Sequence, residues 1–194
     1  MSDNDFSGSD AICKAEEQGL VFSEGKKTLK ECTNKEITEV VIPDSVTEIG
    51  REAFDGCTSL TSVVLPNSVT EIGELAFAGV QQVASNNSKF KVCEAGGLID
   101  VDHQMLLYVP PCTTEYVLPD SVTKIGYGGF QGCTSLTSVV LPDSVTEIGN
   151  GAFKNCESLT SVVLPDSVTE IGWDTFYGAG CEEQVYRDYL HLFK

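Results

Sequence analysis

Residues Leu60–Gly73 read LTSVVLPNSVTEIG, and this stretch decides the fold because the chain repeats it. It returns with Asp in place of Asn at Leu136–Gly149 and at Leu159–Gly172. Shorter versions begin at Ile37 and near Thr113, which makes five copies that can be aligned. A unit of about this length that is repeated along the chain indicates a solenoid, in which each copy stacks on the one before it.

A regular spacing keeps the copies in phase. In each copy an isoleucine follows the proline by six residues, and neighbouring copies are 23 residues apart. One interval differs: Ile72 and Ile125 are 53 residues apart, so 30 residues are inserted, at about residues 83–112. The repeated positions are the prolines Pro43, Pro66, Pro119, Pro142 and Pro165, the isoleucines Ile49, Ile72, Ile125, Ile148 and Ile171, and the phenylalanines Phe54, Phe77, Phe130, Phe153 and Phe176.

Each copy predicts one short β-strand. Thr61–Leu65 alternates and is rich in β-branched residues, which is typical of a strand, and Pro66 ends it. A lone copy cannot bury all its apolar positions, whereas stacked copies cover one another and pair their strands at about 4.8 Å. We expect Gly73 and its equivalents to supply a backbone turn that other residues do not adopt.

The consensus LxxVxLPxxVxxIGxxAFxxC resembles the BspA-like, or Treponema-type, leucine-rich repeat over about residues 19–180. The resemblance implies a repeat solenoid of the leucine-rich-repeat class, with one short parallel strand in each 23-residue coil. It also implies a variant coil at about residues 83–112, which we expect as an inserted β-hairpin. Gly19-Leu20-Val21 and Leu29 echo Gly97-Leu98-Ile99 and Leu106, so the N-terminal piece looks like a second copy of that insertion.

The domain organisation follows from these patterns. We expect a disordered tail at residues 1–9, a solenoid over residues 10–180 and a C-terminal capping helix at residues 181–194. Val185, Tyr189, Leu192 and Phe193 fall at helical spacing in that last segment, suitable for covering the final coil. Residues 10–18 are expected to form the opposite cap, and Trp173 is expected to lie under the C-terminal helix.

The charge of the chain restricts its partners. Twelve Lys and Arg against 29 Asp and Glu give a net charge of −17, which repels phosphate backbones and anionic lipids. No apolar run approaches the roughly 18 residues of a membrane span. We therefore expect no nucleic acid, no membrane insertion, and a protein or other surface macromolecule as partner, bound by a monomer.

The compartment stays open at this stage. Proteins that resemble this one are commonly cell-surface or secreted modules, which implies the same place here. Residues Met1–Asp10 do not show the basic and then apolar pattern of a signal peptide, so a cytoplasmic protein is the alternative.

Three of the eight cysteines share one repeat position. Cys57, Cys133 and Cys156 stand where other copies have Val80 and Ala179, which favours buried thiols used as small apolar groups over a metal or redox role. A ladder with one cysteine per coil does not converge into a tetrahedral zinc site. Cys93 and Cys112 are the candidates for a disulfide in the insertion.

No catalytic residue, cofactor or metal is expected. His103 and His191 are isolated from any evident nucleophile, so an enzyme is not indicated. Rows of carboxylates suggest calcium, but turn residues and solvated glutamates explain them better. These rows are Asp44, Asp120, Asp143 and Asp166 with Asn67, and Glu48, Glu71, Glu147 and Glu170 interrupted by Lys124.

The strand register predicts a binding face. Val63 and Leu65 point inward, so Ser62 and Val64 face outward on the strand side, expected to be concave. The residues predicted to contact a partner are a valine stripe, Val41, Val64, Val117, Val140 and Val163, and the flanking residues Glu39, Ser62, Glu115, Ser138 and Ser161. The alternative is that valine serves strand packing alone.

A contiguous apolar row rimmed by polar groups is typical of an interaction site. The sequence therefore predicts a non-enzymatic protein-binding or adhesion module, and the alternative is a structural or self-assembling scaffold.

Overall fold

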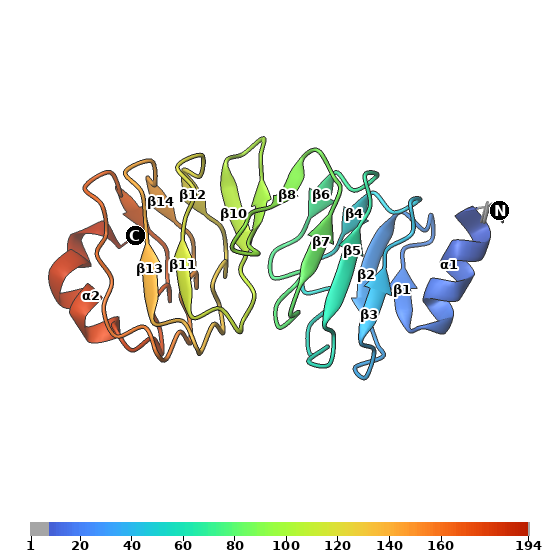
Figure 1. The fold of residues 1–194 in the computed structure, drawn as a ribbon, viewed down its shortest axis with the longest axis horizontal. Helices are drawn as coiled ribbons and strands as arrows, with labels where there is room; N and C mark the ends of the chain where they lie inside the picture. The colour runs from blue at the N-terminus through green and yellow to red at the C-terminus, as the bar shows by residue number, and fades with distance from the viewer. Residues whose placement is uncertain (1–7, 194) are drawn as a thin grey trace. The chain divides into compact units, whose positions relative to one another are not determined.

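The computed structural model of the chain describes residues 8–193. It forms two compact units, unit 1 ending at Ser88 and unit 2 beginning at Lys89 (Figure 1). The tail predicted at residues 1–9 falls mainly on residues 1–7, outside the described residues, and Gly8 begins a helix. The single solenoid domain expected over residues 10–180 stays a prediction.

Unit 1 begins with a helix and continues as coils. Strands β1, β2, β4 and β6 form one sheet in that order, and β3, β5 and β7 form another. All pairs are parallel except β1 and β2. The elements are α1 Gly8–Glu17, β1 Leu20–Phe22, β2 Thr28–Cys32, β3 Glu39–Val41, β4 Glu48–Ile49, β5 Ser62–Leu65, β6 Glu71–Ile72 and β7 Val83–Ser85.

Unit 2 repeats the plan and ends with a helix. One sheet has the order β15-β14-β12-β10-β9-β8, and the other contains β11 and β13. The elements are β8 Phe90–Val92, β9 Leu98–Asp100, β10 Met105–Tyr108, β11 Glu115–Val117, β12 Lys124–Ile125, β13 Ser138–Val140, β14 Glu147–Ile148, β15 Glu170–Ile171, α2 Glu182–Tyr189 and the 3-10 helix η1 Leu190–Leu192.

The stacking register confirms the repeat solenoid. Equivalent residues of successive copies pair directly, as Ile49 does with Ile72 and Ile125 with Ile148. Each copy also contains a second, two-residue strand at its Glu-Ile or Lys-Ile pair, which the residue pattern does not predict. Two residues are too few to show the alternation by which a strand is detected.

The predicted hairpin insertion is present. Strands β8, β9 and β10 pair antiparallel in sequence order, and β10 then pairs parallel with β12. The predicted N-terminal echo follows the same plan, since β1 and β2 are antiparallel and β2 is parallel to β4. Leu29 pairs with Ile49 in unit 1 as Leu106 pairs with Ile125 in unit 2.

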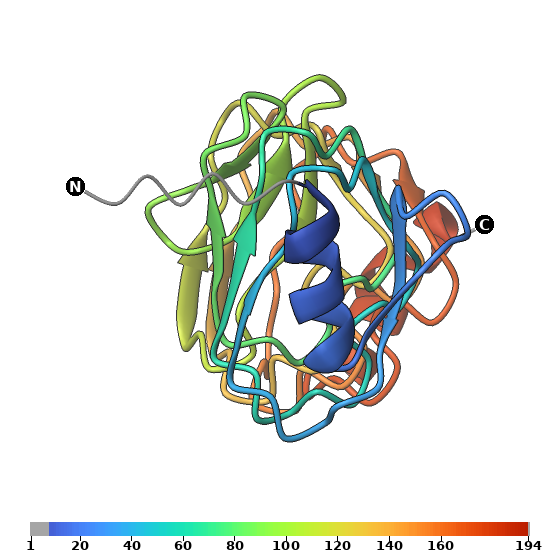
Figure 2. The same cartoon turned by 90° about the vertical axis from the view of Figure 1, so that its right-hand side faces the viewer.

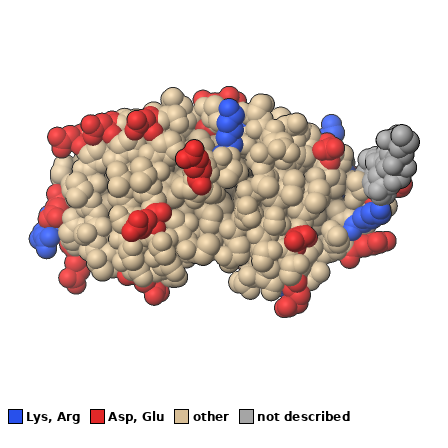
Figure 3. All heavy atoms as spheres, in the orientation of Figure 1, with Lys and Arg blue, Asp and Glu red and all other residues tan. Residues whose placement is uncertain are grey.

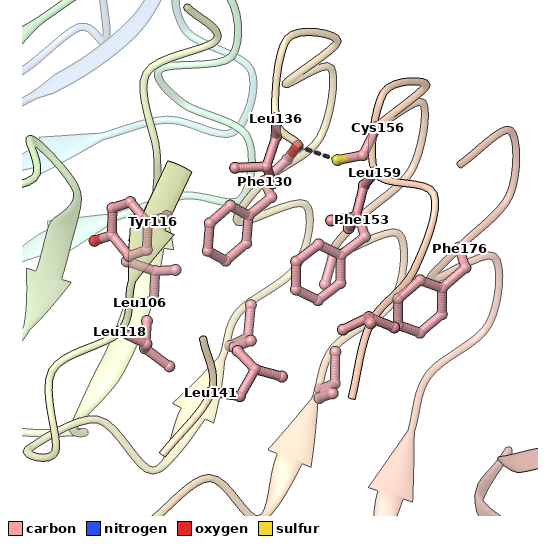
Figure 4. Close-up of a cluster of buried hydrophobic side chains, with 14 of the residues drawn as sticks. Leu106, Tyr116, Leu118, Phe130, Leu136, Leu141, Phe153, Cys156, Leu159 and Phe176 are labelled. Atoms are coloured by element: carbon pink, nitrogen blue, oxygen red, sulfur yellow. Dashed lines mark hydrogen bonds between the residues drawn. The ribbon is translucent and has the colours of Figure 1, made fainter. Parts of the chain in front are cut away.

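The repeated phenylalanines form the centre of each core. In unit 2, the Phe153 ring stacks between Phe130 and Phe176, with ring centroids 4.8 Å and 5.2 Å away (Figure 4). In unit 1, Phe54 stacks on Phe77 at 5.7 Å. These rings are buried, and truncation of a buried Phe to Ala typically costs about 3–5 kcal/mol, so the stack is a main source of cohesion between coils.

The expected role of Gly73 is wrong. Gly73 and its equivalents do not have positive φ; a Cβ at Gly73 would lie 2.4 Å from the backbone nitrogen of Arg51 in the preceding coil. The left-handed residues of this coil are Leu75 (φ 55°) and Gly79 (φ 85°). Gly73 is therefore required by the close approach of two coils, and the turn itself is made elsewhere.

A helix covers each end of the chain. Helix α1 buries Ile12 and Ala15 and lies across the end of the unit 1 coils (Figure 2). Helix α2 buries Val185, as the capping prediction requires. Trp173, however, is 71% exposed, so its predicted place under the helix is wrong. Among residues 8–193 no helix combines the length and apolar character needed to cross a membrane.

Candidate functional site

In unit 1 the predicted face contains two strands in register. Val41 pairs with Val64, and Glu39 pairs with Ser62. Val41 is 67% exposed, whereas Val64 is half-buried. The alternate residues Val40 and Val63 are buried, so the side chains alternate between core and surface as expected for strands.

In unit 2 the same face exposes three valines. Val117, Val140 and Val163 are 65%, 53% and 78% exposed, and the polar residues beside them are exposed as well. Val117 pairs with Val140, and Glu115 pairs with Ser138. The predicted residues thus form two groups, one on each unit, and their role in binding stays a prediction.

One predicted strand is absent from this face of unit 2. Residues 160–164 have the same sequence as the strand-forming residues 61–65, yet they form no strand. In the described part of the chain, no backbone hydrogen bond joins β13 to residues 160–164. The ladder of this sheet therefore ends at β13, one coil earlier than the repeat predicts.

A groove of about 470 Å³ lies where the ladder is interrupted. We call it the β13 groove: one wall is Thr137–Leu141 with Asp143, and the other is Ser161–Val163 with Pro165. Four of the predicted residues, Ser138, Val140, Ser161 and Val163, line it. The sequence alone gives no sign of this groove, because its walls are copies of one another.

Helix α2 holds the second wall. The Val162 N–H donates to Gln184 Oε1 at 3.2 Å, and Gln184 Nε2 donates to the Val162 carbonyl at 3.3 Å. The Leu164 N–H donates to the hydroxyl oxygen of Tyr189 at 3.3 Å. Side chains of the helix therefore satisfy the backbone groups that a following coil would pair with, which protects this edge.

The groove opens towards the core. Val139 occupies the inward position that Val40, Val63, Tyr116 and Val162 occupy in other coils. Those four side chains are at most 3% exposed, whereas Val139 is only half-buried. The interrupted ladder thus leaves apolar surface accessible beside the exposed valines.

Acidic groups dominate the charges of unit 2. Asp143 and Asp166 are exposed and follow the prolines that end the two walls. Figure 3 shows acidic atoms along the upper margin of this unit and few basic ones. Lys124, which interrupts the glutamate row, forms an ion pair of 2.7 Å with Glu147, and this hydrogen bond raises the pKa of Lys124.

No cluster of metal ligands appears among residues 8–193: no three His, Cys, Asp or Glu side chains converge. His103 Nδ1 lies 2.8 Å from Asp100 Oδ2, and the same buried carboxylate accepts the His103 N–H at 3.1 Å. This local pair orders the turn between β9 and β10. His191 lies in η1 and is exposed.

The repeated cysteines act as small apolar groups. Burial raises the pKa of Cys156 from 9.0 to about 12 and raises the pKa of Cys133 further. The Cys156 thiol donates to the Phe130 carbonyl at 3.1 Å (Figure 4). Such thiols stay protonated at neutral pH and are poor nucleophiles and ligands, in keeping with the prediction from their shared position.

Cys93 and Cys112, the candidates for a disulfide, are not bonded to each other. Both are free thiols. The Cys93 sulfur lies 3.0 Å from the hydroxyl of Tyr116 in the core, whereas Cys112 is exposed. The two side chains therefore have different surroundings.

These features define the chain as a leucine-rich-repeat solenoid. A family model described as the BspA type leucine rich repeat region matches residues 25–92 and 109–186, in six copies. The chain belongs to this family. A comparison with curated proteins gives no match.

Solved structures that resemble the chain include two bacterial proteins. A leucine rich cell surface protein from Faecalibacterium prausnitzii is 26% identical, with a TM-score of 0.57, and the match covers 77% of this chain and 52% of that one. The pneumococcal vaccine antigen PcpA is 22% identical, with a TM-score of 0.65, and the match covers 81% of this chain and 48% of that one. The chain thus spans about half the length of either protein.

Proposed function

We propose that the chain is a non-enzymatic protein-binding or adhesion module that recognises a partner through the strand face of its solenoid. The observation that carries the proposal is the row of exposed valines on unit 2, rimmed by Glu115, Ser138 and Ser161. Contiguous exposed apolar surface with a polar rim is typical of protein interfaces. Val41 and Glu39 offer a second, smaller group on unit 1.

The proposal includes no catalytic step. His103 is engaged by Asp100, and the buried thiols remain protonated because burial raises the pKa of Cys133 and Cys156. The similar Faecalibacterium protein is named a cell surface protein, which supports a place for this chain outside the cell. Binding to another protein surface, and hence adhesion, agrees with that place.

Lysine substitution in the valine stripe tests the proposal. Proteins captured by the wild-type chain from native or host lysate are identified by mass spectrometry, and the affinity of a purified partner is then measured. We expect the Val140→Lys, Val163→Lys double variant to lose at least about tenfold in affinity, because two buried charges each oppose the interface by more than 1 kcal/mol. Val101→Lys is the matched control, since Val101 is 41% exposed in unit 2 but lies outside the stripe. Unchanged affinity of the double variant would refute the proposal.

A self-assembling scaffold is the second candidate, because the same exposed valines can face those of another copy. Light scattering over a hundredfold range of concentration separates the two functions. A mass that stays that of one chain, 20.8 kDa, eliminates the scaffold, and a mass that rises with concentration favours it.

A further inference from the structure

We propose that the β13 groove binds an extended, basic segment of a partner protein, which adds to the free edge of β13 as a further strand. This inference rests on the proposed function and deepens it, since it names the form and charge of the partner. Addition of a strand to an exposed sheet edge is a general mode of peptide recognition, in which main-chain hydrogen bonds supply much of the affinity.

The backbone of β13 is arranged for such an addition. Ser138 and Val140 bond towards β11: the Ser138 N–H donates to the Thr114 carbonyl, and the Leu118 N–H donates to the Val140 carbonyl. Because backbone groups alternate along a strand, Val139 directs its N–H and carbonyl to the opposite side, into the groove. In unit 1 the equivalent Val63 N–H donates to the Gln82 carbonyl at 3.0 Å, whereas within residues 8–193 Val139 has no such bond.

The side chains of the groove favour an apolar residue between polar ones. Val139, Leu141 and Val162 form an apolar floor, and exposed Val140 and Val163 stand at the rim. Burial of this surface contributes roughly 25 cal/mol per Å². The hydroxyls of Ser138 and Ser161 supply hydrogen-bonding groups beside it.

The wall sequences do not account for the open state, and we attribute it to the attachment of the second wall to helix α2. Thr137–Pro142 and Thr160–Pro165 both read TSVVLP, as does Thr61–Pro66, which forms β5 and pairs on both sides. The distinguishing feature of the second wall is its attachment to Gln184 and Tyr189. The helix therefore holds this wall where it does not pair with β13.

Charge selects the occupant. Asp143 lines the groove, exposed Asp166 follows the wall residue Pro165, and exposed Glu115 pairs with the wall residue Ser138. A segment with Lys or Arg at its ends gains from these carboxylates, and nucleic acid is repelled by them. A second copy of this chain is disfavoured as well, since each copy carries a net charge of −17.

The experiment uses hydrogen exchange of single amides, measured by NMR on the full chain, with a synthetic peptide as the probe. The peptide is the strand sequence of the coils, TSVVLP, with a lysine at each end and blocked termini. In the free chain we expect the Val139 amide to exchange at least about tenfold faster than the Val63 amide. Saturating peptide should slow exchange at Val139 about tenfold or more and leave Val63 unchanged. The same peptide with glutamates in place of lysines should bind several-fold more weakly.

Two variants in α2 test the cause of the opening. Gln184→Ala removes both bonds to Val162 and leaves only the Tyr189 bond to Leu164, so the second wall is held less firmly away from β13. We expect a Val139 amide that is protected without peptide and a weaker peptide affinity. Glu183→Ala is the matched control, because Glu183 is exposed on the same helix and lines no part of the groove.

Several outcomes would overturn the inference. These are a Val139 amide as slow as that of Val63 in the free chain, no slowing with millimolar peptide, and equal binding of the acidic peptide. Protection of Val139 that grows with the concentration of the chain alone would assign the groove to a second copy.

Val117→Lys separates this inference from the proposed function, because Val117 lies in the valine stripe but not in the groove. If the captured partner depends on Val117 while the peptide does not bind, the groove inference fails and the proposed function stands. If the peptide binds but no partner depends on the stripe, the proposed function fails and the peptide groove remains.

Discussion

Substitution of two glycines in one coil of unit 1 tests why glycine recurs in this repeat. Gly73 and Gly79 are six residues apart, but they differ in what an added Cβ would encounter. At Gly73 the Cβ would lie 2.4 Å from the Arg51 nitrogen and 2.7 Å from the Gly50 carbonyl carbon. At Gly79 it would meet nothing within 4 Å, but φ there is +85°. Gly73→Ala therefore creates a clash between coils, and Gly79→Ala creates only local backbone strain.

The magnitudes follow from these distances. An ordinary contact of at least 3.4 Å at Gly73 requires the two coils to separate by about 1 Å, which breaks the 2.7 Å bond from the Gly73 N–H to the Ile49 carbonyl. The lost bond costs about 1 kcal/mol and the overpacking about 1–3 kcal/mol, so we expect a loss of about 2–4 kcal/mol in the free energy of unfolding. Alanine in the left-handed region at residue 79 costs only about 1–2 kcal/mol.

Urea unfolding followed by circular dichroism measures both losses. Asparagine sharpens the comparison, because Asn155 occupies the position of Gly79 in another copy with φ 60°. We expect Gly79→Asn to be nearly neutral and Gly73→Asn to be at least as damaging as Gly73→Ala. If Gly73→Ala costs no more than Gly79→Ala, or if the two asparagine variants are equally stable, the close approach of coils does not explain Gly73.

Further predictions concern the core and the thiols. Phe153→Ala should cost about 3–5 kcal/mol in urea unfolding, because the ring is buried between two others, whereas Tyr177→Ala, at a position that is 56% exposed, should cost less than about 0.5 kcal/mol. At pH 8 a thiol reagent should modify exposed Cys13 and Cys112 quickly and buried Cys133 and Cys156 only after unfolding; rapid labelling of all eight would contradict the buried positions. Burial raises the pKa of Cys156 from its ordinary value of 9.0 to about 12, so the folded state binds the thiol proton more tightly than the unfolded state does. The contribution of this thiol to stability is therefore complete below pH 9 and should be lost progressively as the pH rises to 12. Melting temperatures measured over this pH range test the prediction.

The sequence predicts those parts of the fold in which the position of a residue in one copy determines the position of its equivalent in the next copy. Residue spacing alone gives the pairing of Ile49 with Ile72 and the stacked phenylalanines, since equivalent positions of a solenoid must coincide. The role of Gly73 was not predictable in this way, because both a left-handed turn and a close approach demand glycine. The exposure of Trp173 was not predictable either. Large apolar residues favour burial on average, but the sequence does not show which side of the coil this residue faces.

The candidate site was predictable only in part. Alternation along a single strand gives the exposure of Val117 and Val140 correctly, and Val163 is exposed as well although its segment forms no strand. The β13 groove depends on how helix α2, more than 15 residues further along the chain, attaches to residues 162–164. Such a contact leaves no periodic signal in the sequence, and its only trace there is the pair of polar side chains, Gln184 and Tyr189, on a helix expected to cap the solenoid.

The end of a solenoid offers free backbone groups for recognition, and its interior does not. Within the stack, the backbone groups of each coil are occupied by the coils on either side, as those of β5 are, so only side chains remain for recognition. At the last coil the ladder must stop, and its free backbone groups must be covered or left available. Helix α2 covers Val162 and Leu164 with side chains, but by holding this wall it leaves the edge of β13 open one coil earlier. The same cap that protects the terminal edge therefore leaves a site at β13 where both backbone and apolar side chains can meet a partner.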